Sequence, residues 1–528
     1  MSARAQYVKL SANRDQFLTT ARQAADLTLP YLIRDDESYY NSSKVLKTPW
    51  QSVGAKGVVT LASKLMLALL PPQTSFFKLQ VNDTKLGEDL GPEIRSELDL
   101  SFAKIERTIM ESVAASDDRV VVHQALKHLV VAGNALIFMG KEGLKLFPLN
   151  RYAIDRDGNG NVIEIVTKET ISKKLLKKFY PGYTEAVPNS PGMDSVSSTT
   201  QQQCEVFTHV KLDGNRWIWH QEIEDKIVPG TMGKSPKDSS PWLVLRFNHV
   251  DGEVYGRGRV EEFMGDLRSL EALSQALVEG SAAAAKVVFT VSPSSTTKPA
   301  TLAKAGNGAI VQGRPDDIGV VQVGKTADFK TAFDMATTLS QRISEAFLVL
   351  NVRNSERTTA EEVRMTQLEL EQQLGGLFSL LTIEFLVPYL NRKLNVAQKT
   401  GEIPRLPKGD IVKPTIVAGI NAIGRGQDAE SLGQFLQTIA QTMGPEAIGT
   451  FINSEEVIKR LAAAQGIDVL NLVKSMQEVQ QEQAQAMQQQ QQIEMTKQAG
   501  QFAQVDQKRE EMYNGESDTS PPPTPQEG

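Results

Sequence analysis

Cysteine is almost absent from the 528-residue sequence, which contains a single one, Cys204. One thiol cannot form a disulfide within the chain, and it cannot supply the several thiolate ligands of a structural zinc site. So little cysteine is typical of proteins made in a reducing compartment, and we expect cytoplasmic synthesis. The sequence offers Cys204 no catalytic partner, so we interpret it as a small packing residue.

An excess of positive charge is also missing. The chain has 57 Lys and Arg residues against 63 Asp and Glu residues, a net charge of -6. Proteins that hold nucleic acid by bulk electrostatic attraction need clustered Lys and Arg side chains. The charge balance therefore excludes a protein that binds nucleic acid tightly through a generally basic surface.

Long hydrophobic runs are absent too. The first ten residues lack the apolar stretch that a secretory signal requires. The strongest apolar run, 58–70, is interrupted by Ser63 and Lys64, and it is shorter than the ~20 residues that a membrane-spanning helix needs. We therefore predict a soluble protein without a membrane partner.

One partial motif for phosphate binding is incomplete. Gly233, Lys234 and Ser235 resemble the end of a phosphate-binding loop. The glycine required five residues earlier is replaced by Val228, and Pro236 stands where a helix should begin. We predict a surface loop at this position rather than a nucleotide site.

A partial calcium-binding pattern fails in the same way. Asp155, Asp157, Asn159 and Gly160 match the first half of such a loop, but its twelfth position, normally Glu, is Val166. The segment lies between two expected strands, so we predict a hairpin turn on Asp-Gly-Asn-Gly. With no nucleophile elbow or dinucleotide motif either, we predict no catalytic residue, metal site or cofactor.

What the sequence does contain predicts an α+β protein that is mainly helical. Its length exceeds the roughly 250–300 residues that one core supports, so we expect more than one structural unit. Apolar residues recur at spacings of three and four in 58–70 and 120–131, which predicts helices there. Residues 135–248 contain short, partly alternating segments rich in β-branched and aromatic residues, which predict strands.

Two long amphipathic helices are predicted next. Apolar residues step by three and four from Val260 to Leu277, and again from Phe329 to Leu350. The insert between them, 287–323, contains three strand-like stretches, VVFTV, GAIVQ and GVVQV. We therefore expect a protruding, hairpin-like stalk of two helices that carries a small β insert.

A short polar segment, 351–357, follows the second of these helices. It contains Arg353 and Arg357, and Thr358 with Glu361 then fits the capping box of the next helix. Two interpretations of the segment stay open, a solvated turn or a site at which symmetry multiplies the arginines. The glutamine-rich stretch from Met476 also has two interpretations, a disordered tail or a helix that self-associates.

Six sequence blocks resemble the head-to-tail connector, or portal, proteins of short-tailed bacteriophages. The blocks are TPWQSVGAKGVVTLASKLMLALLPPQTSFFKL (48–79), ALKHLVVAGNALIFM (125–139), DGEVYGRGRVEEFMGDLRSLEAL (251–273), RPDDIGVVQVGKTADF (314–329), RTTAEEVRMTQLELEQQLGGLFSLL (357–381) and PTIVAGINAIGRGQD (414–428). They occur in the family's order and cover the chain from about residue 10 to residue 430. The glutamine-rich segment departs from the family pattern.

The resemblance implies a wedge-shaped subunit with a wing, a long-helix stem, a small β-containing clip and a helical crown. The implied domains are an N-terminal wing (1–257), a stem helix (258–286), the clip (287–325), a second stem helix (326–350), a tunnel loop (351–357), the rest of the wing with a long bent helix (358–430), crown helices (431–475) and a glutamine-rich segment and tail (476–528).

The resemblance also implies a function. Portal proteins form a ring of twelve subunits at one vertex of the virion's capsid, where double-stranded DNA is packaged and later ejected. The implied partners are further copies of the chain, DNA, the terminase large subunit, a tail adaptor, and the major capsid and scaffolding proteins that assemble around it. Synthesis is expected in the host cytoplasm. Such a protein is not an enzyme; the alternative is a phage nucleic-acid enzyme, either a packaging ATPase or a nuclease.

The resemblance places candidate site residues in two segments. The tunnel loop contributes Arg353, Asn354 and Arg357 as candidates for contact with DNA. The clip contributes charged candidates for partner docking, since exposed charges steer association; these are Lys298, Lys304, Arg314, Asp316 and Asp317. Residues 257–350 hold ten Lys and Arg and ten Asp and Glu, a neutral balance that suits a channel through which DNA slides.

Overall fold

The computed structural model describes two compact units, 1–423 and 424–528, each of which is considered by itself. The residues that it describes are 1–34, 46–72, 75–81, 92–183, 203–284, 288–294, 298–306, 309–312, 314, 316, 318–321, 326–349, 375–406, 412–416, 425–444, 452 and 457–458. The segment 351–357, the start of the next helix and the glutamine-rich stretch lie outside these residues.

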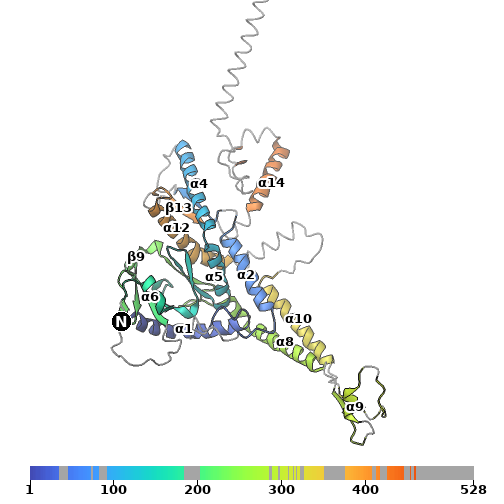
Figure 1. Cartoon of the computed structure of the whole chain (residues 1–528). Coiled ribbons are helices and arrows are strands. Elements are labelled where there is room, and N and C mark those ends of the chain that lie inside the picture. The colour runs from blue at the N-terminus through green and yellow to red at the C-terminus, as the bar shows by residue number, and fades with distance from the viewer. Residues whose placement is uncertain are drawn as a thin grey trace, which may run out of the picture. The chain divides into compact units, whose positions relative to one another are not determined.

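Four helices dominate the N-terminal part of the first unit (Figure 1). They are α1 (Ala3–Asp26), α2 (Val53–Leu69), α4 (Pro92–Ala115) and α5 (Asp118–Ala132). The helices predicted over 58–70 and 120–131 are confirmed as α2 and α5. Helix α5 ends at Gly133, whose φ of 72° is the left-handed conformation that favours glycine at a helix end.

Two antiparallel sheets follow the helices. One has three strands in the order β10-β2-β3, and the other has six, with the order β4-β5-β6-β7-β8 and β9 paired to β7. The strands are β2 (Asn134–Met139), β3 (Leu144–Phe147), β4 (Tyr152–Arg156), β5 (Val162–Ser172), β6 (Gln203–Asp213), β7 (Arg216–Ile223), β8 (Lys226–Ile227), β9 (Gly233–Pro236) and β10 (Trp242–Arg246). Short helical turns connect some of them: η1 (Leu149–Arg151), α6 (Lys173–Phe179) and η3 (Lys237–Ser239).

One large apolar core joins these helices to the three-stranded sheet. Strands β2 and β10 are almost entirely buried, which explains their continuous apolar sequences. The core continues into the base of the long helices described below. Helix α1 instead packs its N-terminal half on the six-stranded sheet, where Tyr7, Ala153 and Phe207 share a smaller cluster.

The prediction of a surface loop around Lys234 is wrong, because Gly233–Pro236 forms strand β9. Gly233 pairs with Trp219 of β7, and a Cβ atom at Gly233 would lie 2.2 Å from the Trp219 ring. The glycine is therefore required where the indole covers the backbone. The sequence showed the glycine but could not show the ring that packs on it.

The hairpin turn predicted on Asp157–Gly160 is confirmed, since it connects the antiparallel strands β4 and β5. The Asp157 carboxylate accepts the backbone N–H groups of Asn159 and Asn161 at 3.0 and 2.7 Å. These bonds lower the pKa of Asp157, with the hydrogen bond from the Asn161 side chain as the main cause. The aspartate therefore organises the turn.

The two predicted amphipathic helices are confirmed, with a break at Phe263. The first consists of α7 (Arg259–Glu262) and α8 (Met264–Ala284), and the second is α10 (Thr326–Ala346). Figure 1 shows α8 and α10 side by side as a hairpin, which we call the stem hairpin. With 21 residues each, the helices are about 32 Å long at 1.5 Å per residue.

The insert between these helices contains one antiparallel strand pair, β11 (Val288–Val291) with β12 (Ile318–Val321), and a short helix, α9 (Pro299–Lys304). The prediction of a strand at 308–312 is wrong over the described residues 309–312, which do not form a strand. Ile310 there is fully exposed, and no described strand pairs with it. An apolar sequence alone does not make a strand without a partner for its backbone.

The remaining elements return to the first unit's core or lie in the second unit. Strand β1 (Phe77–Val81) pairs with β13 (Val412–Ile416), although more than 300 residues separate them in the sequence. Helix α12 (Val387–Thr400) follows a π-helical turn, η5 (Thr382–Leu386), and Pro388 is its second residue. The second unit contains α14 (Arg425–Met443).

Candidate functional site

The stem hairpin is held together by close contact between its two helices. A Cβ atom at Gly280 of α8 would lie only 2.5 Å from the ring of Phe329 in α10. Glycine thus lets the aromatic ring lie directly on the opposing helix backbone. Nearer the body, Leu267 and Leu270 of α8 and Ile343 of α10 are buried. The hairpin is therefore packed along one seam.

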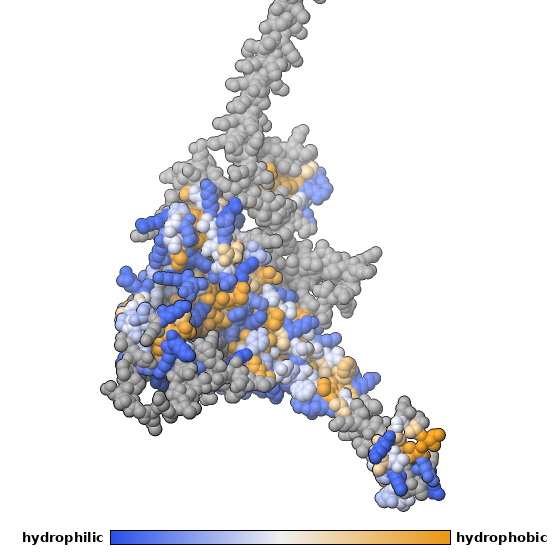
Figure 2. Space-filling view, in the orientation of Figure 1, coloured by the Kyte–Doolittle hydropathy of each residue, from blue (hydrophilic) through white to orange (hydrophobic). Residues whose placement is uncertain are grey.

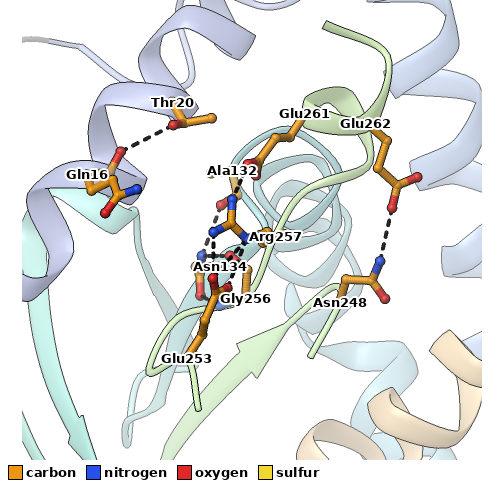
Figure 3. A network of polar contacts seen from close by, with 10 residues as sticks. All are labelled: Gln16, Thr20, Ala132, Asn134, Asn248, Glu253, Gly256, Arg257, Glu261 and Glu262. Carbon is orange, nitrogen blue, oxygen red and sulfur yellow. Dashed lines mark hydrogen bonds and ion pairs between the residues drawn. The ribbon is translucent and has the colours of Figure 1, made fainter. Parts of the chain in front are cut away.

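The hairpin begins at a crossing of three glycines, which we call the root. A Cβ atom at Gly133, Gly256 or Gly258 would lie within 2.9 Å of backbone atoms of the opposing segment. The Asn134 side chain bridges the crossing, because it donates to the Gly256 carbonyl at 2.6 Å and accepts the Gly256 N–H at 2.7 Å (Figure 3). Only glycine allows two backbones to approach so closely.

Arg257 lies at the centre of the root, between two carboxylates. Its guanidinium donates to Glu253 at 2.5 and 2.9 Å and to Glu261 at 2.5 Å (Figure 3). The hydrogen bond to Glu253 is the largest cause of the raised pKa of Arg257, with Glu261 adding to it. The guanidinium also lies over the Phe17 ring of α1, 5.4 Å from its centre. Arg257 thus connects the start of the hairpin to the N-terminal helix.

The end of α10 is fixed at the same root. Arg259 donates to the Ala346 carbonyl at 3.1 and 3.3 Å, and Lys64 of α2 donates to the Leu348 carbonyl at 2.7 Å. Both cations lie at the C-terminal end of a helix, where the macrodipole and unpaired carbonyls favour positive charge. The two helices of the hairpin are therefore anchored at one place.

Leu348 ends α10 in an unusual conformation. Its φ is 56°. The Leu348 N–H donates to the Glu345 carbonyl at 2.9 Å, and the Val349 N–H donates to the Ser344 carbonyl at 2.8 Å. This is a Schellman motif with leucine at the position that normally holds glycine, at a cost of roughly 1–2 kcal/mol. The preceding Phe347 is fully buried, and a Cβ atom at Gly57 of α2 would lie 2.8 Å from it. Packing therefore maintains the strained end.

A further contact ties α8 to the start of α2. The Glu271 carboxylate accepts the Trp50 N–H at 3.0 and 3.1 Å and the Gln51 N–H at 3.3 Å. Within the hairpin, Arg342 of α10 lies 3.4 Å from Asp266 of α8. These polar contacts fix orientation rather than provide reactive groups, and they suit a rigid structural element.

The structure gives positions for four of the eight candidate residues. Lys298 and Lys304 lie at the two ends of α9, and Arg314 and Asp316 precede β12; all four are exposed. The structure does not bring them into one described cluster. Asp317 and the tunnel-loop candidates lie outside the described residues; the latter are Arg353, Asn354 and Arg357.

The residues of the root are those that sequence reasoning missed. The signal was present in Gly256-Arg257-Gly258-Arg259, where glycine and arginine alternate within one of the matched blocks. Glycines on both sides of an arginine indicate close backbone approach around a charged group. The acceptors, however, come from distant segments, and spacing alone does not reveal them.

The described residues include no group of three or more His, Cys, Asp or Glu residues able to hold a metal ion. His128 of α5 is buried, which lowers its pKa to about 4, so it is neutral at pH 7. In the part of the chain that the structure describes, no helix is both long and apolar enough to cross a membrane.

Comparisons with known proteins place the chain in one family. A family profile described as "Bacteriophage head to tail connecting protein" matches residues 1–472. The portal protein of Escherichia phage T7 is 37% identical over 493 residues, covering 91% of this chain and 90% of the relative. That of Enterobacteria phage T3 is 37% identical, covering 90% and 89%, and that of Enterobacteria phage SP6 is 30% identical, covering 90% of each chain.

One solved structure aligns with the chain more weakly. A chain from the neck of an empty GTA particle aligns with a TM-score of 0.37 and 13% identity, covering 79% of this chain and 90% of that chain. This likeness is too weak to support a functional argument.

The sequence relatives are decisive because they match nearly end to end. The T7 alignment covers 91% of this chain, and the family profile spans the root, the stem hairpin and the insert. The resemblance drawn from the six sequence blocks is thereby confirmed. The chain belongs to the head-to-tail connecting proteins of short-tailed bacteriophages, the family of the T7 and T3 portal proteins.

Proposed function

We propose that twelve copies of this portal protein form a ring at one vertex of the capsid, and that the phage genome passes through its channel. The family match over residues 1–472 carries the proposal. The ring would be built in the host cytoplasm with the major capsid and scaffolding proteins around it and would remain in the virion. Its function is structural, in contrast to that of a packaging ATPase or nuclease.

The stem hairpin supports assembly with further copies. Two helices alone cannot cover all of their apolar side chains, and Val278, Phe333 and Met335 are 52%, 63% and 54% exposed. Figure 2 shows apolar side chains at the surface of this hairpin. Large exposed apolar groups on an element of this kind are typical of an interface. In the ring, neighbouring hairpins would cover them and together form the stem.

The mass of the purified particle tests the ring. Twelve copies of the 58.0 kDa chain would have a mass of about 696 kDa, and negative-stain images would show rings with a central opening. A chain that remains monomeric or dimeric in all buffers would overturn the proposal. Assays of ATP hydrolysis and DNA cleavage on the same sample separate it from the enzyme alternative.

We assign contact with DNA to the tunnel loop, 351–357. Arg353 and Arg357, repeated by ring symmetry and accompanied by Asn354, would form a local basic collar in a channel whose stem and clip, 257–350, carry no net charge. We expect the double substitution Arg353→Ala and Arg357→Ala to leave ring mass unchanged and to reduce the DNA retained in particles. Normal packaging by this variant would exclude the collar.

We assign partner docking to the clip, 287–325. Its exposed charges on and after α9, Lys298, Lys304, Arg314 and Asp316, would meet first the terminase large subunit and then the tail adaptor. Deletion of residues 295–310 should abolish adaptor capture in a pulldown while rings still form. Retained capture would place the docking surface elsewhere.

A further inference from the structure

The insert between α8 and α10 contains a sheet that is too small to be stable by itself. Its strands β11 and β12 have four residues each, and no further described strand pairs with either of them. Both strands are therefore edges, and an edge presents a row of backbone N–H and C=O groups without strand partners. An isolated two-stranded sheet is marginally stable in water, and three strands are normally needed. The sheet lacks a third strand.

A segment of the same insert has the properties of the missing strand. Residues 309–312, Ala-Ile-Val-Gln, contain two β-branched side chains and match the length of β11 and β12. Ile310 is fully exposed, and the N–H groups of Ile310 and Val311 form no backbone hydrogen bond with a described residue. Figure 2 shows apolar side chains on the surface of the insert. The sequence of this segment favours a strand, yet the single subunit leaves the segment unpaired.

The sheet of the same subunit does not take up the segment, although only residues 313–317 separate it from β12. A ring provides another partner. In a cyclic ring each subunit meets its two neighbours through different surfaces, which is a heterologous arrangement. A subunit that donates a segment to one neighbour and offers a sheet edge to the other would satisfy every copy in the same way.

We propose that residues 309–312 of each copy add as a third strand to the β11–β12 sheet of the next copy. The inference rests on the ring proposed above, and it names a contact between subunits other than that of the stem hairpins. An extended segment that adds to an open sheet edge gains main-chain hydrogen bonds. Ile310 would be covered by the neighbouring sheet, and every insert would be joined to the inserts on both sides.

Photo-cross-linking tests the pairing without assuming its register. The photoreactive residue p-benzoylphenylalanine in place of Ile310 replaces a fully exposed side chain, so the subunit should still fold. After irradiation of purified rings, we expect a ladder of linked chains on a denaturing gel, and peptide mapping should join position 310 to 288–291 or 318–321 of another copy. The same residue in place of Lys304, which is exposed at the end of α9, is the control and should link to neither strand.

The outcomes distinguish this pairing from the ring itself. Particles that have the mass of the ring but show no such link, or links only within one chain, would overturn the pairing and leave the ring in place. A link that forms only after a different protein is added would assign the segment to that partner and would also overturn the pairing. A chain that never forms rings would overturn both proposals.

Hydrogen exchange provides an independent measurement on the assembled rings. The double substitution Ile310→Pro and Val311→Pro removes N–H groups on both sides of the added strand, because neighbouring N–H groups in a strand point in opposite directions. The control, Ile310→Val with Val311→Ile, keeps both N–H groups and both β-branched side chains. Amides of one sheet edge, at 288–291 or 318–321, should be protected in the natural protein and in the control, and the proline variant should lose this protection. Equal exchange in all three would overturn the proposal.

Discussion

At the scale of single residues, buried charge is concentrated where segments distant in sequence meet. Glu384 receives three hydrogen bonds from Arg246, including one from its backbone N–H at 2.8 Å. In another such cluster, Asp118 at the start of α5 accepts the Tyr389 hydroxyl at 2.6 Å and lies 2.7 Å from Lys393 of α12. Both acidic side chains connect residues 382–400 to the core, so replacing either one should lower the free energy of unfolding.

We expect Glu384→Gln to destabilise the protein by about 3 kcal/mol, because it leaves the buried guanidinium groups of Arg156 and Arg246 without a counter-charge. The free energy of unfolding can be measured by chemical denaturation. Glu142→Gln, at an exposed residue, is the control and should change it little. Equal effects of the two substitutions would show that Glu384 is not needed to neutralise the arginines.

His128 should make stability depend on pH. Burial lowers its pKa to about 4 from an ordinary value of 6.5, so the unfolded chain binds a proton more readily than the folded one. The contribution of neutral His128 to the free energy of unfolding is complete above pH 6.5 and is lost as the pH falls towards 4. At pH 5 the loss is about 2 kcal/mol.

Comparison of unfolding at pH 7 and pH 5 checks this expectation. Between pH 7 and pH 5, His128→Met should lose about 2 kcal/mol less of its free energy of unfolding than the natural protein does. His123→Gln changes a less buried histidine and should retain most of the pH-dependent loss. A His128→Met variant as sensitive to pH as the natural protein would assign the loss to other groups.

Residue-scale features were the least predictable from the sequence. The turn at Asp157 depends on local conformation, and local sequence indicated it. The pairing of Arg246 with Glu384 joins residues 138 positions apart. Nothing in the spacing of such residues reveals that folding will bring them together.

At the scale of elements, the stem hairpin was predicted well because periodicity is a property of the sequence itself. Helices α8 and α10 were evident from apolar residues at spacings of three and four. The short strands β8 and β9 were not predicted, since their partners are what make them strands. The pairing of β1 with β13 was equally invisible.

Contact between α2 and the end of α10 should be sensitive to one added methyl group. Gly57→Ala would bring a Cβ atom to 2.8 Å from Cγ of Phe347, whose side chain is fully buried. We expect a loss of about 1–3 kcal/mol in the free energy of unfolding. Gly265→Ala in α8, where a Cβ atom would meet nothing within 4 Å, should be neutral or slightly stabilising. A neutral Gly57→Ala would show that Phe347 can shift.

At the scale of the whole molecule, six ordered sequence blocks were enough to predict the family, and the near end-to-end relatives confirmed it. Composition was informative in a different way. A net charge of -6 excludes a protein that binds DNA tightly through a generally basic surface. It is compatible with a protein that surrounds DNA without holding it.

Assembly should depend on the apolar surface of the stem hairpin. Phe333→Asp places a charge on a side chain that is 63% exposed in the single subunit, so the subunit should still fold. If neighbouring hairpins cover this residue, rings should be lost or weakened, as measured by mass photometry. Val8→Asp on α1, also 63% exposed, is the matched control. Unchanged rings from Phe333→Asp would remove this residue from the subunit interface.

The root has a mechanical consequence for the stem hairpin. Both of its helices are fastened at the same end, α8 through the glycine crossing and Arg257, and α10 through Arg259 and Lys64. The hairpin is therefore a cantilever, clamped at its base. A sideways load applied at its far end would act with the leverage of about 32 Å of helix. The bending moment would be greatest at the clamp, where the closest backbone contacts and the ion pairs of Arg257 are found.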